Sequence, residues 1–232
     1  MLTDLWARAE NDLCPATASG LPDLTIWEHS ARVARLTEVI AGFPEVRRHV
    51  LDRAALALAA LYHDIGWLLQ LRAGQIRSSD LLLKRTSTRQ REMASQWMIE
   101  HLEGLLPPRG LQLAARIVRE CSDRQARLPE VQILAEAESL DEIGPQAIWG
   151  MVRRQLTEGK SLLDLVEVWR RQQEYRYWPT WIRDCLRFPS SRVLAEERYQ
   201  SLARFMADLQ TTCLPPTAPQ DKPGPMMAET QA

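Results

Sequence analysis

The sequence has little lysine and no marked excess of either charge. Among its 29 basic residues the only lysines are Lys84, Lys160 and Lys222, and the formal net charge is −1 at pH 7. A chain without an overall positive field carries no strong electrostatic signal for binding nucleic acid or an acidic membrane surface. The abundant arginines suit contacts with phosphate or carboxylate groups, because a guanidinium presents paired donors.

Cysteine is also sparse, and the four cysteines show no CxxC or CxH spacing. The spacing therefore indicates neither a structural zinc knot nor a disulfide framework. No uninterrupted apolar run approaches the roughly 18 residues of a membrane span, and the beginning of the chain lacks a signal-peptide pattern. We expect a soluble, cytoplasmic protein without a membrane partner. The cysteines are Cys14, Cys121, Cys185 and Cys213.

Alternating β-branched runs, which are typical of strands, are missing too. Apolar residues recur at spacings of three and four, which predicts an all-α fold. Prolines mark several helix boundaries, because the residue before a proline disfavours helix. We predict one helical domain over 1–210 and a disordered tail over 211–232, which is rich in proline. The expected helices are 2–13, 25–42, 45–65, 87–106, 109–121, 129–143, 145–157, 161–175, 179–186 and 191–210.

One histidine lies on the apolar face of the second expected helix. In TIWEHSARVARLTEVI, His29, Val33, Leu36 and Ile40 follow one another at helical spacing. The side chain of His29 is therefore expected to point into the protein. A lone histidine in such a position is more often a hydrogen-bonded core residue than a metal ligand, so its companions decide its role.

The segment ALYHDIGW places two further polar residues at the end of an apolar helix. Burying His63 and Asp64 is costly unless their charge is paired or a metal ion is bound. We predict that Gly66 is the C′ residue of the helix 45–65, so that the pair lies in its last turn. The free carbonyl groups of that turn make the local potential negative, which favours a cation.

A later helix carries carboxylates on its buried face. In PEVQILAEAESLDEIG, Glu138 shares a face with Val131 and Leu134, and Asp141 lies one turn further on. Taken alone, such an acid could instead cap a helix or pair with an arginine. Together with the two histidines and the aspartate above, it forms a set of imidazoles and carboxylates. That set suits a divalent transition metal better than calcium, which prefers oxygen ligands alone.

This order of residues resembles the HD-domain superfamily of metal-dependent phosphohydrolases. HSARVARL resembles the family's first-histidine helix, ALYHDIGW its HD segment, and ILAEAESLDEIG its DADxLDxxG segment. The resemblance covers roughly residues 25–210. It implies a helical bundle in which His29, His63 and Asp64 bind one divalent ion (Mn, Fe, Co, Ni, Zn or Mg). An acid from the last segment would complete the set.

The sequence also departs from the family pattern. Glu138 stands where a metal-binding aspartate is usual, and we predict that it is the fourth ligand. Asp141 is then expected to bind a ligand histidine or an arginine such as Arg32. Trp67 replaces the lysine of the HDIGK signature, and the two further histidines of dinuclear relatives are absent. RTSTRQREMASQW has no histidine and IVRECSDRQ offers Cys121, so a mononuclear or degenerate site is expected.

The resemblance implies hydrolysis of a nucleotide or another small phosphoester by a metal-activated water. Asp64 would help to orient that water, and Arg32 and Asp141 would act beside it as further catalytic residues. Positive side chains near the metal would bind the phosphate. The candidates, Lys84 and Arg85, lie at the end of the loop expected over 66–86, which is a candidate lid.

Two other classes of function stay open. The chain could be a degenerate HD scaffold that binds a ligand or protein partner without catalysis. It could also be a helical interaction module that uses the aromatic segment YRYWPTW, residues 175–181. Bound metal in the purified protein would distinguish the enzyme from the interaction module. Turnover of a phosphoester would distinguish the enzyme from the scaffold. Neither the substrate's identity nor the oligomeric state follows from the sequence.

Overall fold

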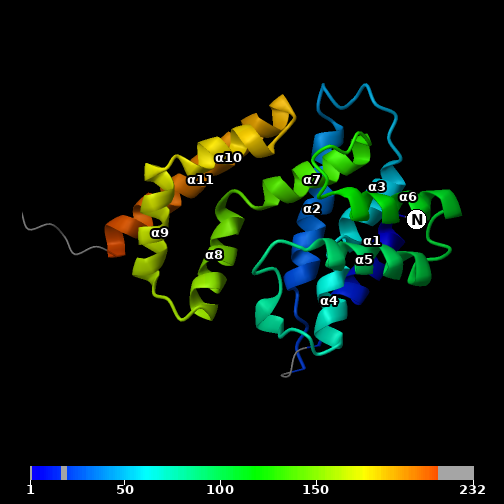
Figure 1. The fold of residues 1–232 in the computed structure, drawn as a ribbon, viewed down its shortest axis with the longest axis horizontal. Coiled ribbons are helices and arrows are strands. Elements are labelled where there is room, and N and C mark those ends of the chain that lie inside the picture. Colours follow the sequence, from blue (N-terminus) through cyan, green and yellow to red (C-terminus); the bar gives the residue numbers. More distant parts are fainter. Residues whose placement is uncertain (1, 17–19, 214–232) are drawn as a thin grey trace, which may run out of the picture.

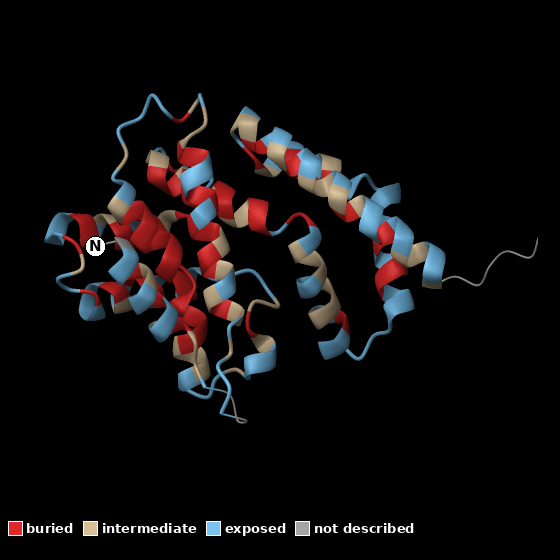
Figure 2. Ribbon diagram, turned by 180° about the vertical axis from the view of Figure 1, so that it is seen from behind, coloured by how far each residue is buried: buried red, intermediate tan, exposed pale blue. Residues whose placement is uncertain are grey.

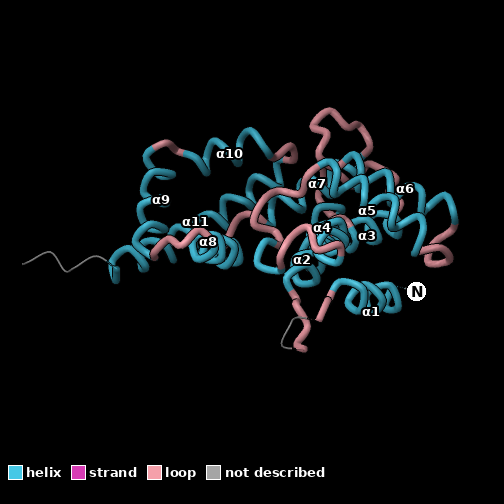
Figure 3. Tube along the Cα trace, turned by 60° about the horizontal axis from the view of Figure 1, so that its bottom comes forward, coloured by secondary structure: helices cyan, strands magenta, loops and turns pink. Residues whose placement is uncertain are grey.

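The computed structural model describes residues 2–16 and 20–213. Within these residues the chain forms eleven α-helices, one short 3-10 helix and no strand beyond two isolated bridges. The predicted all-α fold is therefore confirmed, and Figure 3 shows helices joined by loops. The helices are α1 Leu2–Leu13, α2 Thr25–Ala41, α3 Arg53–Tyr62, α4 Ile65–Arg72, η1 Ser78–Asp80, α5 Thr88–His101, α6 Pro108–Glu120, α7 Pro129–Asp141, α8 Pro145–Thr157, α9 Leu162–Glu174, α10 Tyr177–Cys185 and α11 Pro189–Cys213.

The helices form two groups (Figure 1). The first, α1 to α7, has α3 near its centre, packed against α2 and α6, while α2 also packs along α7. The second, α8 to α11, joins the first through α7. Buried residues are concentrated in the first group (Figure 2), where every residue of α3 from Ala55 to Tyr62 is buried. The most apolar helical stretch, Arg53–Arg72, is long enough to cross a membrane, but 78% of its apolar window lies inside the bundle.

The start of α3 differs from the prediction. The helix expected over 45–65 begins only at Arg53, because Asp52 caps it. The Asp52 carboxylate accepts a hydrogen bond from the amide of Ala55 at 2.9 Å, which satisfies a free donor of the first turn. The amide of Asp52 itself donates to the buried carboxylate of Glu130 on α7 at 2.9 Å. This second bond joins the beginning of α3 to α7.

The predicted role of Gly66 as a helix C′ residue is wrong. α3 ends at Tyr62, α4 begins at Ile65, and Gly66 is the second residue of α4. The glycine is needed for a different reason, which is the close approach of α4 to α5. A Cβ atom at Gly66 would lie 2.2 Å from the backbone oxygen of Gln90. The loop expected over 66–86 is correspondingly shorter, because α4 occupies its first part.

We expect Gly66→Ala to lower the free energy of unfolding by about 2–3 kcal/mol, because the added methyl meets backbone that cannot rotate away. Gly150→Ala, inside α8, is the matched control. A Cβ there meets nothing within 4 Å, so better helix propensity should raise stability by up to about 1 kcal/mol. Urea denaturation compares the two. Equal stability of Gly66→Ala and wild type would contradict the packing described here.

The second group of helices holds most of the aromatic segment 175–181. Trp178 and Trp181 are buried, while Tyr175 and Tyr177 are exposed. The segment therefore packs mainly within its own group. At its end α11 continues to Cys213, so residues 211–213 of the predicted tail are helical. The remainder of that predicted tail, 214–232, lies outside the described residues.

Candidate metal centre

Three side chains from two places in the sequence converge at the junction of α2, α3 and α4. His29 comes from the second turn of α2, His63 is the residue after α3, and Asp64 immediately precedes α4. Nε2 of His29 lies 3.2 Å from Nε2 of His63 and 3.4 Å from Oδ2 of Asp64. Nε2 of His63 lies 3.5 Å from the same oxygen. We call these three residues the donor group.

Each imidazole is oriented by a hydrogen bond at its Nδ1 atom. Nδ1–H of His63 donates to the carbonyl oxygen of Ala60 at 2.7 Å, and a carbonyl can only accept. Nδ1 of His29 lies 2.8 Å from Oδ2 of Asp141. The Nε2 atoms are then left to carry lone pairs, and they face each other and a carboxylate. Such an arrangement is repulsive unless a proton or a metal ion lies between the atoms.

The electrostatics of the donor group favour a cation. Burial lowers the pKa of His29, but Asp141 and Asp64 outweigh it and raise that pKa to about 10. Burial likewise raises the pKa of Asp64, yet His63, His29 and the Arg91 guanidinium hold it well below its ordinary value. Without a metal the group therefore retains a proton. Two imidazole nitrogens and one carboxylate oxygen within 4.8 Å of one another also match the ligands of a divalent transition ion.

Asp64 is itself held by a chain of hydrogen bonds. Its Oδ1 accepts from the Thr86 hydroxyl at 2.6 Å, and Thr86 Oγ1 accepts from the indole N–H of Trp67 at 2.9 Å. Trp67 is buried, so the residue that replaces the signature lysine belongs to this network. Because Thr86 occupies Oδ1, the oxygen turned towards the histidines is Oδ2. Groups that orient a ligand in this way tune metal affinity.

Thr86→Val should weaken metal binding by about 10- to 100-fold, because Asp64 loses the bond that fixes its orientation. Competition with a chromophoric chelator measures the affinity. Thr88→Val provides the control, since Thr88 is exposed at the start of α5. An unchanged affinity in Thr86→Val would show that the hydrogen bond does not support the donor group.

The two acids of α7 have different partners. Oε1 of Glu138 lies 3.5 Å from Nε2 of His63, which is near the donor group. Both Glu138 oxygens, however, accept hydrogen bonds from Arg91 at 2.9 Å. Asp141 accepts from Arg32 at 2.8 Å and 3.1 Å, in addition to its contact with His29. These are the contacts expected of Asp141, while a role of Glu138 as fourth ligand stays a prediction.

A cleft of about 1580 Å³ opens beside the donor group. It is lined by residues from α2 and α7 of the first group and by residues from α8, α9 and α10 of the second. His29 and Asp64 lie in its wall, and so do Arg32, Lys84 and Arg85. Arg85 is paired with Glu142 of the α7 terminus at 2.8 Å. The structure therefore brings the predicted phosphate-binding side chains to the same cleft as the donor group.

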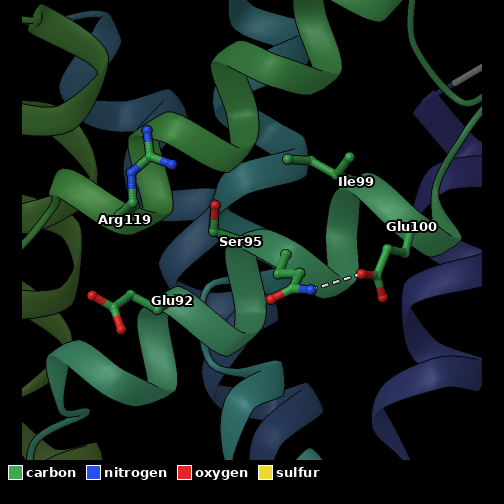
Figure 4. Close-up of a pocket in the computed structure, with 6 residues that line it drawn as sticks. Glu92, Ser95, Ile99, Glu100 and Arg119 are labelled. Carbon is green, nitrogen blue, oxygen red and sulfur yellow. Dashed lines mark hydrogen bonds between the residues drawn. The ribbon is translucent and has the colours of Figure 1, made fainter.

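A second, smaller hollow of about 270 Å³ lies between α5 and α6 (Figure 4). Its charged side chains are Glu92, Glu100 and Arg119, and Glu100 accepts a hydrogen bond from Gln96. None of these residues belongs to the donor group. This hollow therefore adds nothing to the candidate metal centre.

Comparison with known proteins identifies the fold family. The family model of the HD domain matches residues 26–143, which run from α2 to α7 and include the donor group and both acids of α7. The chain belongs to the HD-domain family. Among curated proteins no match to it was found.

Solved bacterial structures resemble this chain over nearly their whole length. The crystal structure of YpgQ from Bacillus subtilis in complex with ADP is 17% identical, with a TM-score of 0.54. The match covers 92% of this chain and 98% of that one. The Lin1889 protein from Listeria innocua is 18% identical, with the same TM-score and coverage. At these identities the likeness concerns the fold alone.

Two residues of the site were not found from the sequence. Thr86 and Arg91 lie in segments that the hydrophobic pattern describes only as a loop and a helix. Their contacts with Asp64 and Glu138 cross 22 and 47 residues of sequence. A weak signal existed for Arg91, because it falls in the segment where a histidine of dinuclear relatives was sought.

Proposed function

We propose that this HD-domain protein is a metal-dependent phosphohydrolase that acts on a nucleotide or another small phosphoester. The observation that carries the proposal is the convergence of His29 Nε2, His63 Nε2 and Asp64 Oδ2 in the wall of a large cleft. Three protein donors leave coordination positions open for water and substrate, as catalytic metal sites require.

The donor group would hold one divalent ion, of which Mn, Fe, Co, Ni, Zn and Mg are the candidates. Once bound, such an ion polarises a phosphoryl oxygen and lowers the pKa of bound water. The remaining steps belong to the chain itself. Thr86 fixes the Asp64 carboxylate, and Asp141 keeps the proton of His29 on Nδ1, which leaves Nε2 available.

Positive charge in the cleft supports binding of an anionic substrate. The Arg32 side chain is 39% exposed, so its guanidinium reaches the cleft while it is paired with Asp141. Lys84 is exposed in the same wall. We propose that these two side chains contact the phosphate groups. Arg32 would lie nearer the reacting phosphorus, because its partner Asp141 also contacts His29.

A nucleotide is the substrate class that the cleft supports best. YpgQ, whose fold this chain shares, was crystallised with ADP. Here the cleft is also lined by Trp149 of α8, which is 68% exposed, and Tyr177 of α10, which is 44% exposed. Flat aromatic faces stack with bases of any kind. The cleft also exceeds the roughly 300–1,000 Å³ of common ligand pockets, so it can accommodate a base, a sugar and phosphates together.

The second candidate is a non-catalytic HD scaffold, and one observation favours it. Glu138, which stands at the place of the family's usual aspartate ligand, has both oxygens bonded to Arg91. A site with fewer available ligands could bind a nucleotide without hydrolysing it.

Two steps of one experiment decide between these functions. The first is elemental analysis of protein purified without chelator. The second is a screen of nucleoside di- and triphosphates and p-nitrophenyl phosphate with added Mn²⁺, Co²⁺, Ni²⁺ or Mg²⁺. We expect hydrolysis that requires metal and stops with chelator. Bound metal without hydrolysis of any of these compounds would favour the scaffold, and absence of bound metal under all conditions would contradict the proposal.

A further inference from the structure

A buried arginine lies beside the donor group and is not explained by the proposed reaction. Arg91 projects from α5 and is only 6% exposed. Nη1 and Nη2 each lie 2.9 Å from an oxygen of Glu138 on α7. Nη1 also lies 2.6 Å from Sγ of Cys121 at the end of α6. One guanidinium therefore joins three helices next to the candidate metal centre.

The guanidinium is a permanent positive charge. Burial lowers the pKa of Arg91, but Glu138, Cys121 and Asp64 outweigh burial and raise it further above its ordinary value. A buried charge of this kind requires an ion-pair partner, and Glu138 provides it. Two parallel charge-assisted hydrogen bonds make this pair one of the stronger polar contacts available to a protein. Both oxygens of Glu138 are thus already bound.

The same pair borders the donor group. Oε1 of Glu138 is 3.5 Å from Nε2 of His63, so a single carboxylate separates the guanidinium from the metal donors. The positive charge of Arg91 also contributes to the low pKa of Asp64. A second divalent ion bound by Glu138 and Cys121 would have to occupy the space that the guanidinium fills. It would also be repelled by the guanidinium's charge.

We propose that Arg91 is a built-in cation that fills a second cation position beside the metal centre. It keeps Glu138 as its ion-pair partner, so that, contrary to the expectation from the sequence, this carboxylate does not bind the metal. The chain therefore binds one ion, held by the donor group alone. This inference rests on the proposed metal centre and adds the number of ions and the role of Glu138.

Removing the guanidinium should create a second metal site. In Arg91→Ser, both oxygens of Glu138 and the sulfur of Cys121 lose their cation and become available as ligands, and the introduced hydroxyl is a further donor beside them. Metal binding can displace the proton of a cysteine thiol. The second ion would then be bound partly through sulfur, which gives cobalt a thiolate charge-transfer band in the near ultraviolet. Arg53→Ser is the matched control, because Arg53 pairs with Glu38 at an exposed position outside the cleft.

The experiment is equilibrium dialysis of the chelator-stripped full-length chain against Co²⁺, with absorption spectra of each variant. We expect one bound ion in wild type and in Arg53→Ser, and two ions with the near-ultraviolet band in Arg91→Ser. A double variant, Arg91→Met with Glu138→Leu, replaces the buried pair by apolar side chains, which proteins commonly tolerate. It should bind one ion, with an affinity within about 10-fold of wild type, because Glu138 is not a ligand.

The outcomes separate this inference from the proposed function. One ion in Arg91→Ser, or a larger loss of affinity in the double variant, would overturn the role given to Arg91. Two ions in wild type would overturn it as well, while leaving the metal-dependent reaction intact. A wild-type chain that binds no Co²⁺ would overturn the metal centre itself and this inference with it.

Discussion

His63→Ala should lose stoichiometric metal binding and, with it, all metal-dependent hydrolysis. His63 is fully buried, and its Nε2 lies within 3.5 Å of both other members of the donor group. Removal of a ligand leaves too few donors to hold a divalent ion, and losses of this kind exceed the about 10- to 100-fold expected for an orienting residue. Metal content after dialysis, measured by mass spectrometry, gives the answer. Asp64→Ala should behave in the same way.

The control for this variant is another histidine of the chain. His101 ends α5, is exposed, and stacks on Trp97 with ring centroids 4.7 Å apart. His101→Ala removes an imidazole without touching the donor group, so metal content and activity should match wild type. If His63→Ala retained one ion per chain, the donor group would not be the metal site. If both variants lost metal, the effect of His63→Ala would reflect general destabilisation.

Metal affinity should rise by about tenfold for each unit of pH through the neutral range. His29 has a pKa of about 10, so in the metal-free chain it carries a proton that the ion must displace. The dependence should level off as the pH approaches that value. Titration calorimetry in buffers of different ionisation enthalpy, repeated at several pH values, counts the protons released. We expect about one proton per ion from His29 at neutral pH.

The same raised pKa affects the stability of the metal-free fold. Because the folded-state pKa of His29 lies above its ordinary value of 6.5, protonation stabilises the folded chain fully below 6.5. That stabilisation is lost as the pH rises through about 10. Asp141→Asn removes one of the charges that raise this pKa. It should therefore weaken the pH dependence of the metal affinity and that of the stability of the metal-free fold. An affinity independent of pH in wild type would show that His29 does not bind the metal through a titrating nitrogen.

The helical pattern of the sequence was sufficient to predict most of the helices, because the apolar residues of each helix recur every three or four residues. It placed His29 on the inner side of α2 and the two acids on α7. It could not place the break before α3, since the bond between Asp52 and Glu130 joins positions 78 residues apart. The position of Gly66 after an apolar run is equally typical of a helix end. Only the close approach of the Gln90 backbone shows why a glycine is required there.

In the candidate metal centre, too, contacts between residues distant in the sequence were not predicted unless a family motif indicated them. Motif order brought the histidines and the aspartate together, because family resemblance carries information about contacts across the fold. Arg91 and Thr86 form no motif, and their effect depends on which atoms of Glu138 and Asp64 they occupy. Pairing of that kind is decided by side-chain geometry, which residue spacing does not encode.

The most direct test is a crystal structure of the chain grown with Mn²⁺, with anomalous differences used to locate the ion. A single peak should lie about 2 Å from His29 Nε2, His63 Nε2 and Asp64 Oδ2. Arg91 should still be bonded to both oxygens of Glu138. A map without a peak at the donor group, or with an ion bound only elsewhere in the cleft, would contradict the metal centre on which the proposed hydrolysis depends.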